Sequence, residues 1–351
     1  MNRGFRKALS VIGFLVVGLF VIRGSLKVEF VQDKMLDIVA SQFVQRALAP
    51  SQDSMGLRIF VCGSASPLGV SDQAQACIAV LTPDHFYIVD SGAGSTANLQ
   101  KNGLPMNRLQ SVLLTHYHSD HIAELYELNL NSWVQGRPNP LNIYGPEGIN
   151  ALVDNVNGTY RQDRIYRVEH HGSGLLSPEL GVMKPHAIPE GRIIQDGELT
   201  ITAYSANHPP IEPSLGYRFD YKGRSVVISG DSLVTQETLK ISDGVDLLLH
   251  DALSLPIVST LSEAANTAGL TRIGKIMADV MDYHASVESL VALDDSIQVR
   301  HVSLYHLVPI PANIVFEEIF LRDLPANYSL AKDGTWFELP ASSDELIIIT
   351  P

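Results

Sequence analysis

Short apolar runs separated by turn residues recur along the chain from about residue 57 onward. Runs such as LRIFVCG, CIAVL, FYIVD and VDLLLHDA are five to eight residues long, which is the usual length of buried strands. Longer segments between them, such as 148–168 and 261–283, predict helices. Strands that alternate with helices in this way predict a mixed α/β domain.

The N-terminal pattern is different. Three cationic residues, Arg3, Arg6 and Lys7, precede an uncharged apolar run over 8–22. This order predicts a signal peptide or membrane anchor over 1–27, which associates with the membrane and directs the rest of the chain to the periplasm. A buried core helix is the alternative interpretation. Apolar positions in 28–56 predict an amphipathic helical connector, so the remaining domain spans 57–351.

Composition narrows the class of protein. The chain has 351 residues, 45% of them hydrophobic, and a formal net charge of −13. These values are typical of a globular protein, and the negative charge makes nucleic acid an unlikely partner. The two cysteines, Cys62 and Cys77, predict either a disulfide between neighbouring strands or two buried thiols.

The candidate chemistry is concentrated in the stretch LLTHYHSDHIA, residues 113–123. It places His116, His118, Asp120 and His121 on a turn between an apolar run that ends at Leu114 and a helix expected over 122–130. Imidazole nitrogens and a carboxylate suit zinc or a related divalent ion. His208 and Asp231 follow predicted strands and are expected at the same sheet edge.

The turn resembles the HxHxDH signature of the metallo-β-lactamase superfamily. The resemblance implies a four-layer αββα sandwich and two divalent metal ions, Zn²⁺ by preference, which share an activated water. It also implies that Asp90 orients a ligand or loop. One ion would be held by His116, His118 and His208, the other by Asp120, His121 and His306, with Asp231 between them.

Three further motifs are similar to the branch of the superfamily that holds ribonuclease Z and the bacterial arylsulfatases. They are CGSASP at 62–67, HDA at 250–252 and HAS at 284–286. The resemblance implies that Asp251 and His284 pair as the proton donor to the leaving group. With Asp120 they form the expected catalytic set of an exported hydrolase that acts on a small sulfate ester or phosphodiester.

Other functions remain open at this point. A lactonase or thioesterase would use the same ligands, a ribonuclease Z-like nuclease would act on RNA, and a non-catalytic binding module would keep only the fold. The segment between His208 and Asp231 is too short for the tRNA-gripping arm that ribonuclease Z inserts there. The assembly, monomer or homodimer, is also open.

Three remaining features carry structural expectations. The His170-His171 pair lies outside the family pattern and is expected in a loop. The segment 261–283 predicts a long helix that either packs plainly or covers the site as a lid. Asp333-Gly334 predicts a hairpin turn before a closing strand.

Overall fold

The computed structural model describes residues 23–48, 55–69 and 71–351 and divides the chain into two units, 1–52 and 53–351. In the first unit, α2 (Glu29–Leu48) is a single helix. This helix lies within 28–56, the range expected to form a helical connector. Among the described residues, no helix combines the length and apolar character needed to cross a membrane. Most of the segment expected to be a signal or anchor, residues 1–22, lies outside the described residues.

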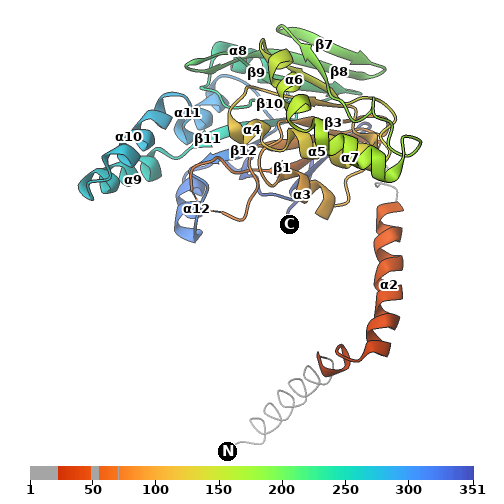
Figure 1. Ribbon diagram of the computed structural model, residues 1–351. Coiled ribbons are helices and arrows are strands. Elements are labelled where there is room, and N and C mark those ends of the chain that lie inside the picture. The colour runs from red at the N-terminus through yellow and green to blue at the C-terminus, as the bar shows by residue number, and fades with distance from the viewer. Residues whose placement is uncertain (1–22, 49–54, 70) are drawn as a thin grey trace, which may run out of the picture. The chain divides into compact units, whose positions relative to one another are not determined.

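The second unit is built on two β-sheets (Figure 1). The eight-stranded sheet has, in spatial order, β15 (Ile347–Ile349), β14 (Trp336–Pro340), β1 (Gly56–Gly63), β2 (Cys77–Leu81), β3 (Phe86–Val89), β4 (Ser111–Leu113), β5 (Asn142–Gly145) and β6 (Lys184–Ala187). The seven-stranded sheet has β13 (Tyr328–Leu330), β12 (His301–Val308), β11 (Leu247–Leu253), β10 (Arg224–Ile228), β9 (Ile211–Tyr221), β8 (Leu199–His208) and β7 (Gly191–Asp196).

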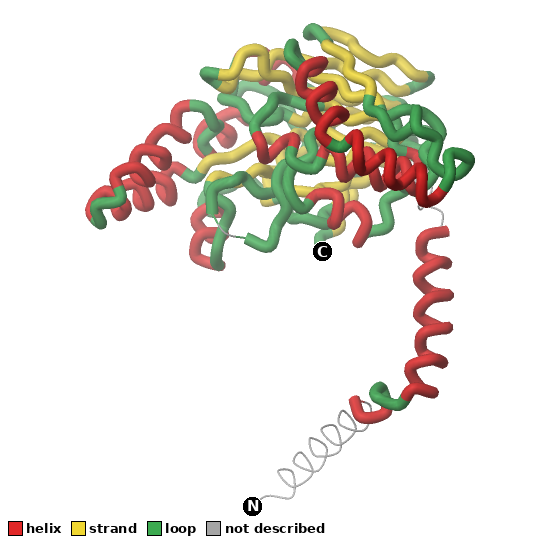
Figure 2. The backbone as a smooth tube through the Cα atoms, in the orientation of Figure 1, coloured by secondary structure: helices red, strands yellow, loops and turns green. Residues whose placement is uncertain are grey.

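Apolar side chains from both sheets meet in one central cluster, which includes Ile59, Val80, Phe219 and Leu249. The outer face of the first sheet packs on α3 (Ser95–Lys101), α5 (Leu125–Val134) and α6 (Ile149–Thr159). The outer face of the second sheet packs on α8 (Gln236–Ser242), α9 (Leu255–Thr267), α11 (Val287–Val291) and α12 (Ile314–Leu321). The result is a helix, sheet, sheet and helix sandwich, with strands between helices in Figure 2.

Parallel strands bring the candidate residues to one edge. β3, β4 and β5 run parallel in the first sheet, and β10, β11 and β12 run parallel in the second. The carboxyl ends of parallel strands lie at a common edge, which is where open α/β sheets hold their ligands. The turn that carries His116, His118, Asp120 and His121, called the metal turn below, follows β4. Asp231 follows β10. Both sheets therefore deliver polar side chains to the same edge.

Several sequence predictions of elements need correction. The helix expected over 261–283 is two helices, α9 and α10 (Thr271–Asp279), which form an antiparallel pair at one side of Figure 1. The helix expected after the metal turn is split into α4 (Ser119–Ile122) and α5. The turn at Asp333-Gly334 joins β13 to β14, which lie in different sheets, so it is not a hairpin. β6 and β7 were not predicted because their exposed, polar sequences lack an apolar run.

Cys62 and Cys77 form a disulfide between β1 and β2. It closes the loop that carries Ser64 and Ser66, and the Ser66 hydroxyl donates a hydrogen bond to the Leu307 carbonyl at 2.7 Å. Asp333 secures the same loop, because its carboxylate accepts hydrogen bonds from the Ser64 amide at 2.9 Å and the Ala74 amide at 2.6 Å. The loop is thus fixed against β12 beside the sheet edge.

We expect the disulfide in the folded protein to leave no reactive thiol. Protein made under oxidising conditions and denatured without reductant should show none of its two cysteines in a thiol titration, and both after reduction. Because the bridge spans 15 residues, its reduction should lower the free energy of unfolding by about 3 kcal/mol. Two reactive thiols in the unreduced sample would instead support two free cysteines.

Candidate functional site

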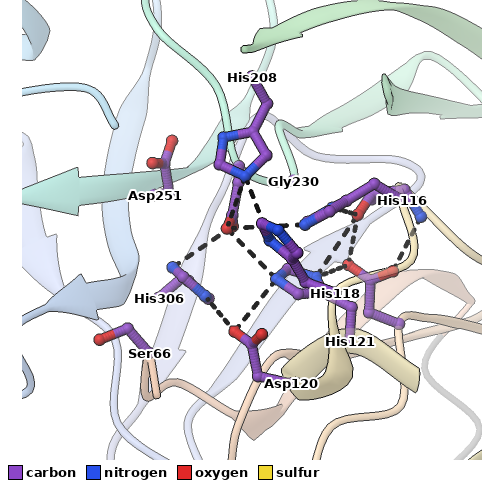
Figure 3. A network of polar contacts seen from close by, with 12 residues as sticks. Ser66, His116, His118, Asp120, His121, His208, Gly230, Asp251 and His306 are labelled. Carbon is purple, nitrogen blue, oxygen red and sulfur yellow. Dashed lines mark hydrogen bonds and ion pairs between the residues drawn. The ribbon is translucent and has the colours of Figure 1, made fainter. Parts of the chain in front are cut away.

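The turn after β4 provides four of the candidate residues. His116 and His118 lie between β4 and α4, and α4 carries Asp120 and His121. Three of these side chains are buried, whereas His118 is exposed. The side chains of the turn converge on one point (Figure 3), and His118 is the one among them that solvent reaches.

The remaining candidates come from the second sheet. His208 is the last residue of β8, and Asp231 follows Gly230, whose φ of +63° suits glycine and whose absent Cβ would meet Thr115 at 2.8 Å. His306 has a φ of +45° and is skipped in the pairing of β11 with β12, which aligns Asp251 with Tyr305 and Ala252 with Leu307. This β-bulge redirects the His306 side chain relative to a regular strand.

The structure brings together all seven residues that the sequence singled out as metal ligands. Their nitrogen and oxygen atoms form two groups, each with its atoms within 4.8 Å of one another. Asp231 belongs to both groups. The first contains His116, His118, His208 and Asp231, and the second contains Asp120, His121, Asp231 and His306.

The donor atoms of both groups suit divalent cations. His306 Nε2 lies 3.0 Å from Asp120 Oδ2, and His121 Nε2 lies 3.4 Å from Asp231 Oδ2. Among the seven candidate ligands, four buried atoms have no hydrogen-bond partner: His116 Nε2, His121 Nε2, His306 Nδ1 and Asp231 Oδ1. Buried polar atoms are rarely left in this state. A pair of cations coordinated by imidazole and carboxylate would satisfy them.

Electrostatics supports the same interpretation. Burial and the neighbouring His121 lower the pKa of His116 well below its usual value, so its ring is neutral and can donate a lone pair. Burial opposes a charge on His121, yet Asp231, Asp90 and Asp120 together raise its pKa. Burial likewise opposes ionisation of Asp231, but His306 and His121 hold its pKa well below the usual range. The nearby carboxylates raise the pKa of both His121 and His306, which favours protons on these rings, and bound cations would replace such protons.

Asp90 orients the metal turn. Its carboxylate accepts hydrogen bonds from the Thr115 amide and the Thr115 hydroxyl, both at 2.9 Å, and lies 2.8 Å from His121 Nδ1. This contact fixes the ring and leaves Nε2 facing the site. Asp90 itself has a φ of +60°, a conformation rare outside glycine. His208 is fixed in a similar way by the Tyr283 carbonyl, 3.1 Å from its Nδ1.

Asp251 and His284 form a buried pair beside the cluster. Asp251 Oδ2 lies 2.8 Å from His284 Nδ1, so the aspartate side chain is long enough to reach the ring. The His284 ring lies against those of His208 and His306, at centroid distances of 5.4 and 5.5 Å. Burial opposes ionisation of Asp251, but His250 and His284 together lower its pKa. The arrangement leaves His284 Nε2 to exchange a proton with a ligand.

The sequence analysis did not identify two residues of the site, His250 and Tyr283. His250 Nδ1 lies 2.9 Å from Asp251 Oδ1, so both carboxylate oxygens are held by histidines. Its only sequence signal was its place in the HDA motif. Tyr283 precedes His284 and had no signal of its own. His170 and His171, expected in a loop, end the exposed helix α7 (Arg161–His171) and are not in the metal-competent groups.

The comparisons with known proteins agree with this geometry. The profile described as "Metallo-beta-lactamase superfamily" matches residues 71–299. A ribonuclease Z from Mycobacterium bovis is 30% identical over 256 residues, which cover 72% of this chain and 86% of that protein. A ribonuclease Z from Mycobacterium marinum is 28% identical, with 72% and 87% covered.

Two solved structures share the fold. The metallo-beta-lactamase fold protein YhfI from Bacillus subtilis superposes with a TM-score of 0.58 at 18% identity, covering 81% of this chain and 99% of that one. The short form of human tRNase Z superposes with a TM-score of 0.54 at 18% identity, covering 80% and 98%. The relatives named ribonuclease Z weaken the expectation, drawn from net charge, that nucleic acid is an unlikely partner.

We expect Asp90→Ala to weaken metal binding without unfolding the protein. The change removes the acceptor that holds His121 and Thr115, and such contacts typically contribute about 10- to 100-fold in metal affinity. Competition with a chromogenic chelator measures the affinity, and circular dichroism reports the fold. Asp196→Ala, a change at an exposed carboxylate, is the matched control. Equal affinity in the two variants would contradict the role given to Asp90.

Proposed function

The chain belongs to the metallo-beta-lactamase superfamily, near ribonuclease Z, and is a metal-dependent hydrolase; from this premise we propose that it cleaves a small phosphodiester. The observation that carries the proposal is the Asp251–His284 pair beside the metal-competent cluster. An ester with a poor leaving group needs a proton on its departing oxygen, and this pair is placed to deliver one. A sulfate ester would be cleaved by the same steps and ranks second.

We propose that the seven clustered residues are the metal ligands and that the ions are zinc. Five imidazoles and two carboxylates, divided between two ions, are a donor set that suits zinc. Ions bound there would supply the positive charge that activates water and stabilises charge on the transferred group. Asp120 and Asp231 balance that charge, while Asp90 and the Tyr283 carbonyl keep the rings of His121 and His208 in place.

His284 acts on the leaving group. Asp251 holds Nδ1 of His284 and so fixes the ring, whose Nε2 is the atom that passes a proton to the departing oxygen. His250 and the Ser232 amide, 3.2 Å from Asp251 Oδ1, hold the carboxylate in turn. The proton is thus held by a pair that is itself fixed, which is a requirement for efficient general acid catalysis.

We further propose that the domain works outside the cytoplasm, with the N-terminal segment as signal or membrane anchor. The uncharged run over 8–22 that follows three cations supports export. The disulfide between Cys62 and Cys77 supports an oxidising compartment. Fractionation of cells that express the full chain tests this location.

A nuclease that acts on RNA is a further candidate function, and the relatives named ribonuclease Z favour it. Two features count against a folded RNA as substrate. Only short turns separate β8, β9 and β10, so the chain from His208 to Asp231 forms no extended arm. The net charge of −13 also opposes binding to a polyanion.

A substrate panel with metal analysis separates these functions. We expect two divalent ions per chain and hydrolysis of an aryl phosphodiester, with weaker turnover of an aryl sulfate, a lactone, a cephalosporin and a short RNA. Removing the ions with a chelator should abolish activity, and zinc should restore it. Asp231→Ala and His118→Ala should lose nearly all turnover. Preferred cleavage of RNA, with strong salt dependence, would favour the nuclease; turnover of the lactone alone would favour attack on a carbonyl.

The Asp251–His284 pair gives a second test, based on leaving-group basicity. We expect His284→Ala and Asp251→Asn to lower kcat by about 10²- to 10⁴-fold for a diester with an alkyl leaving group. A 4-nitrophenyl leaving group departs without a proton, so its kcat should fall far less. His170→Ala serves as the control because that ring lies at the end of the exposed α7. Equal losses with both substrates would rule out proton donation by the pair.

A further inference from the structure

Tyr283 lies between the cluster and the α9–α10 pair. Its ring centroid is 5.0 Å from that of His208 and 4.9 Å from that of His284. The ring is edge-on to His208, with an interplanar angle of 81°. The side chain is partly exposed, so one part of the ring packs on the site and another is open to a ligand.

The position of His284 defines where a leaving group must lie. Its Nδ1 is engaged by Asp251 at 2.8 Å, so Nε2 is the nitrogen that reaches a departing oxygen. A proton transfer needs about 3 Å between the heavy atoms. Because the Tyr283 ring centroid is 4.9 Å from that of His284, the Tyr283 ring is within reach of a group bonded to that oxygen.

Tyr283 also contacts apolar side chains outside the metal-competent groups. Tyr283 packs on a small cluster of Leu253, Val258, Val280 and Val308, whose other partly exposed members are Leu68, Leu255, Met277 and Met281. Leu253 and Val308 end β11 and β12, which also carry Asp251 and His306. An apolar wall therefore adjoins the proton donor, and methionines there adapt to ligands of different shape.

We propose that Tyr283 binds the leaving group of the substrate and gives the enzyme a preference for flat, aromatic leaving groups. The inference rests on the proposed ester hydrolysis and adds to it the chemical class of the departing group. An aromatic ring beside Tyr283 gains from edge or stacked contacts as well as from burial against the apolar wall. The Tyr283 carbonyl, which fixes His208, has a separate role that a side-chain change leaves in place.

Binding of two inert ligands tests the proposal without turnover. Benzyl(methyl)phosphinate and dimethylphosphinate both carry the single negative charge of a phosphodiester, and carbon replaces the leaving oxygen, so neither is hydrolysed. Titration calorimetry with the metal-loaded protein should show that the benzyl ligand binds about tenfold more tightly. Tyr283→Ala should remove this preference, and Tyr283→Phe should keep it.

The controls separate this inference from the proposed function. Ile273→Ala alters an apolar side chain that is 46% exposed on the same helical pair and should leave both affinities unchanged. Metal content and circular dichroism identify any variant that has lost its fold, in which case Tyr283→Leu replaces Tyr283→Ala. Equal binding of the two ligands by the unaltered protein, or a preference that survives in Tyr283→Ala, overturns the inference. Failure of the proposed function is seen separately, as absent turnover of every ester in the panel.

Discussion

The buried carboxylate of Asp231 is the constraint on which the site depends. A carboxylate at 2% exposure is tolerated only where positive charge surrounds it. That charge comes from His121 and His306, which are held by Asp90 and Asp120 in their turn. The two sheets must therefore meet with these groups in register. Asp90 and His306 both have left-handed backbone conformations, and this local strain accompanies the placement of their side chains in the site.

The sequence was most informative where metal-competent side chains directly follow predicted strands. His116, His118, Asp120 and His121 occur within one short turn, and the strands predicted before His208 and Asp231 placed those two residues at one sheet edge. The complete ligand set, which includes His306, came from the resemblance to the metallo-β-lactamase superfamily. The pairing of Asp251 with His284 came from resemblance, since 33 residues separate them and no local rule links such positions. The strand predictions for β1, β2, β3 and β11 were confirmed because each is a mostly buried apolar run between clear turns.

Other features depend on tertiary structure that a linear pattern does not contain. β6 and β7 are exposed edge strands, and an apolar run does not mark them. The β-bulge at His306 could not be predicted from the sequence. All residues of β12 are buried, so the sequence lacks the alternation of apolar and polar residues that a bulge would interrupt. The break between α9 and α10 and the crossing from β13 to β14 depend on what each segment packs against. His250 and Tyr283 gained meaning only from their neighbours in space.

The spread of the candidate ligands along the chain, from His116 to His306, bears on how the protein matures. Neither metal-competent group is complete in the first sheet or in the second alone, because each draws atoms from both. A growing chain cannot assemble the first group before Asp231 is free to fold, or the second group before His306 is. Metal loading is then a late step of biosynthesis, and the supply of ions in the compartment where folding ends decides which metal the protein acquires.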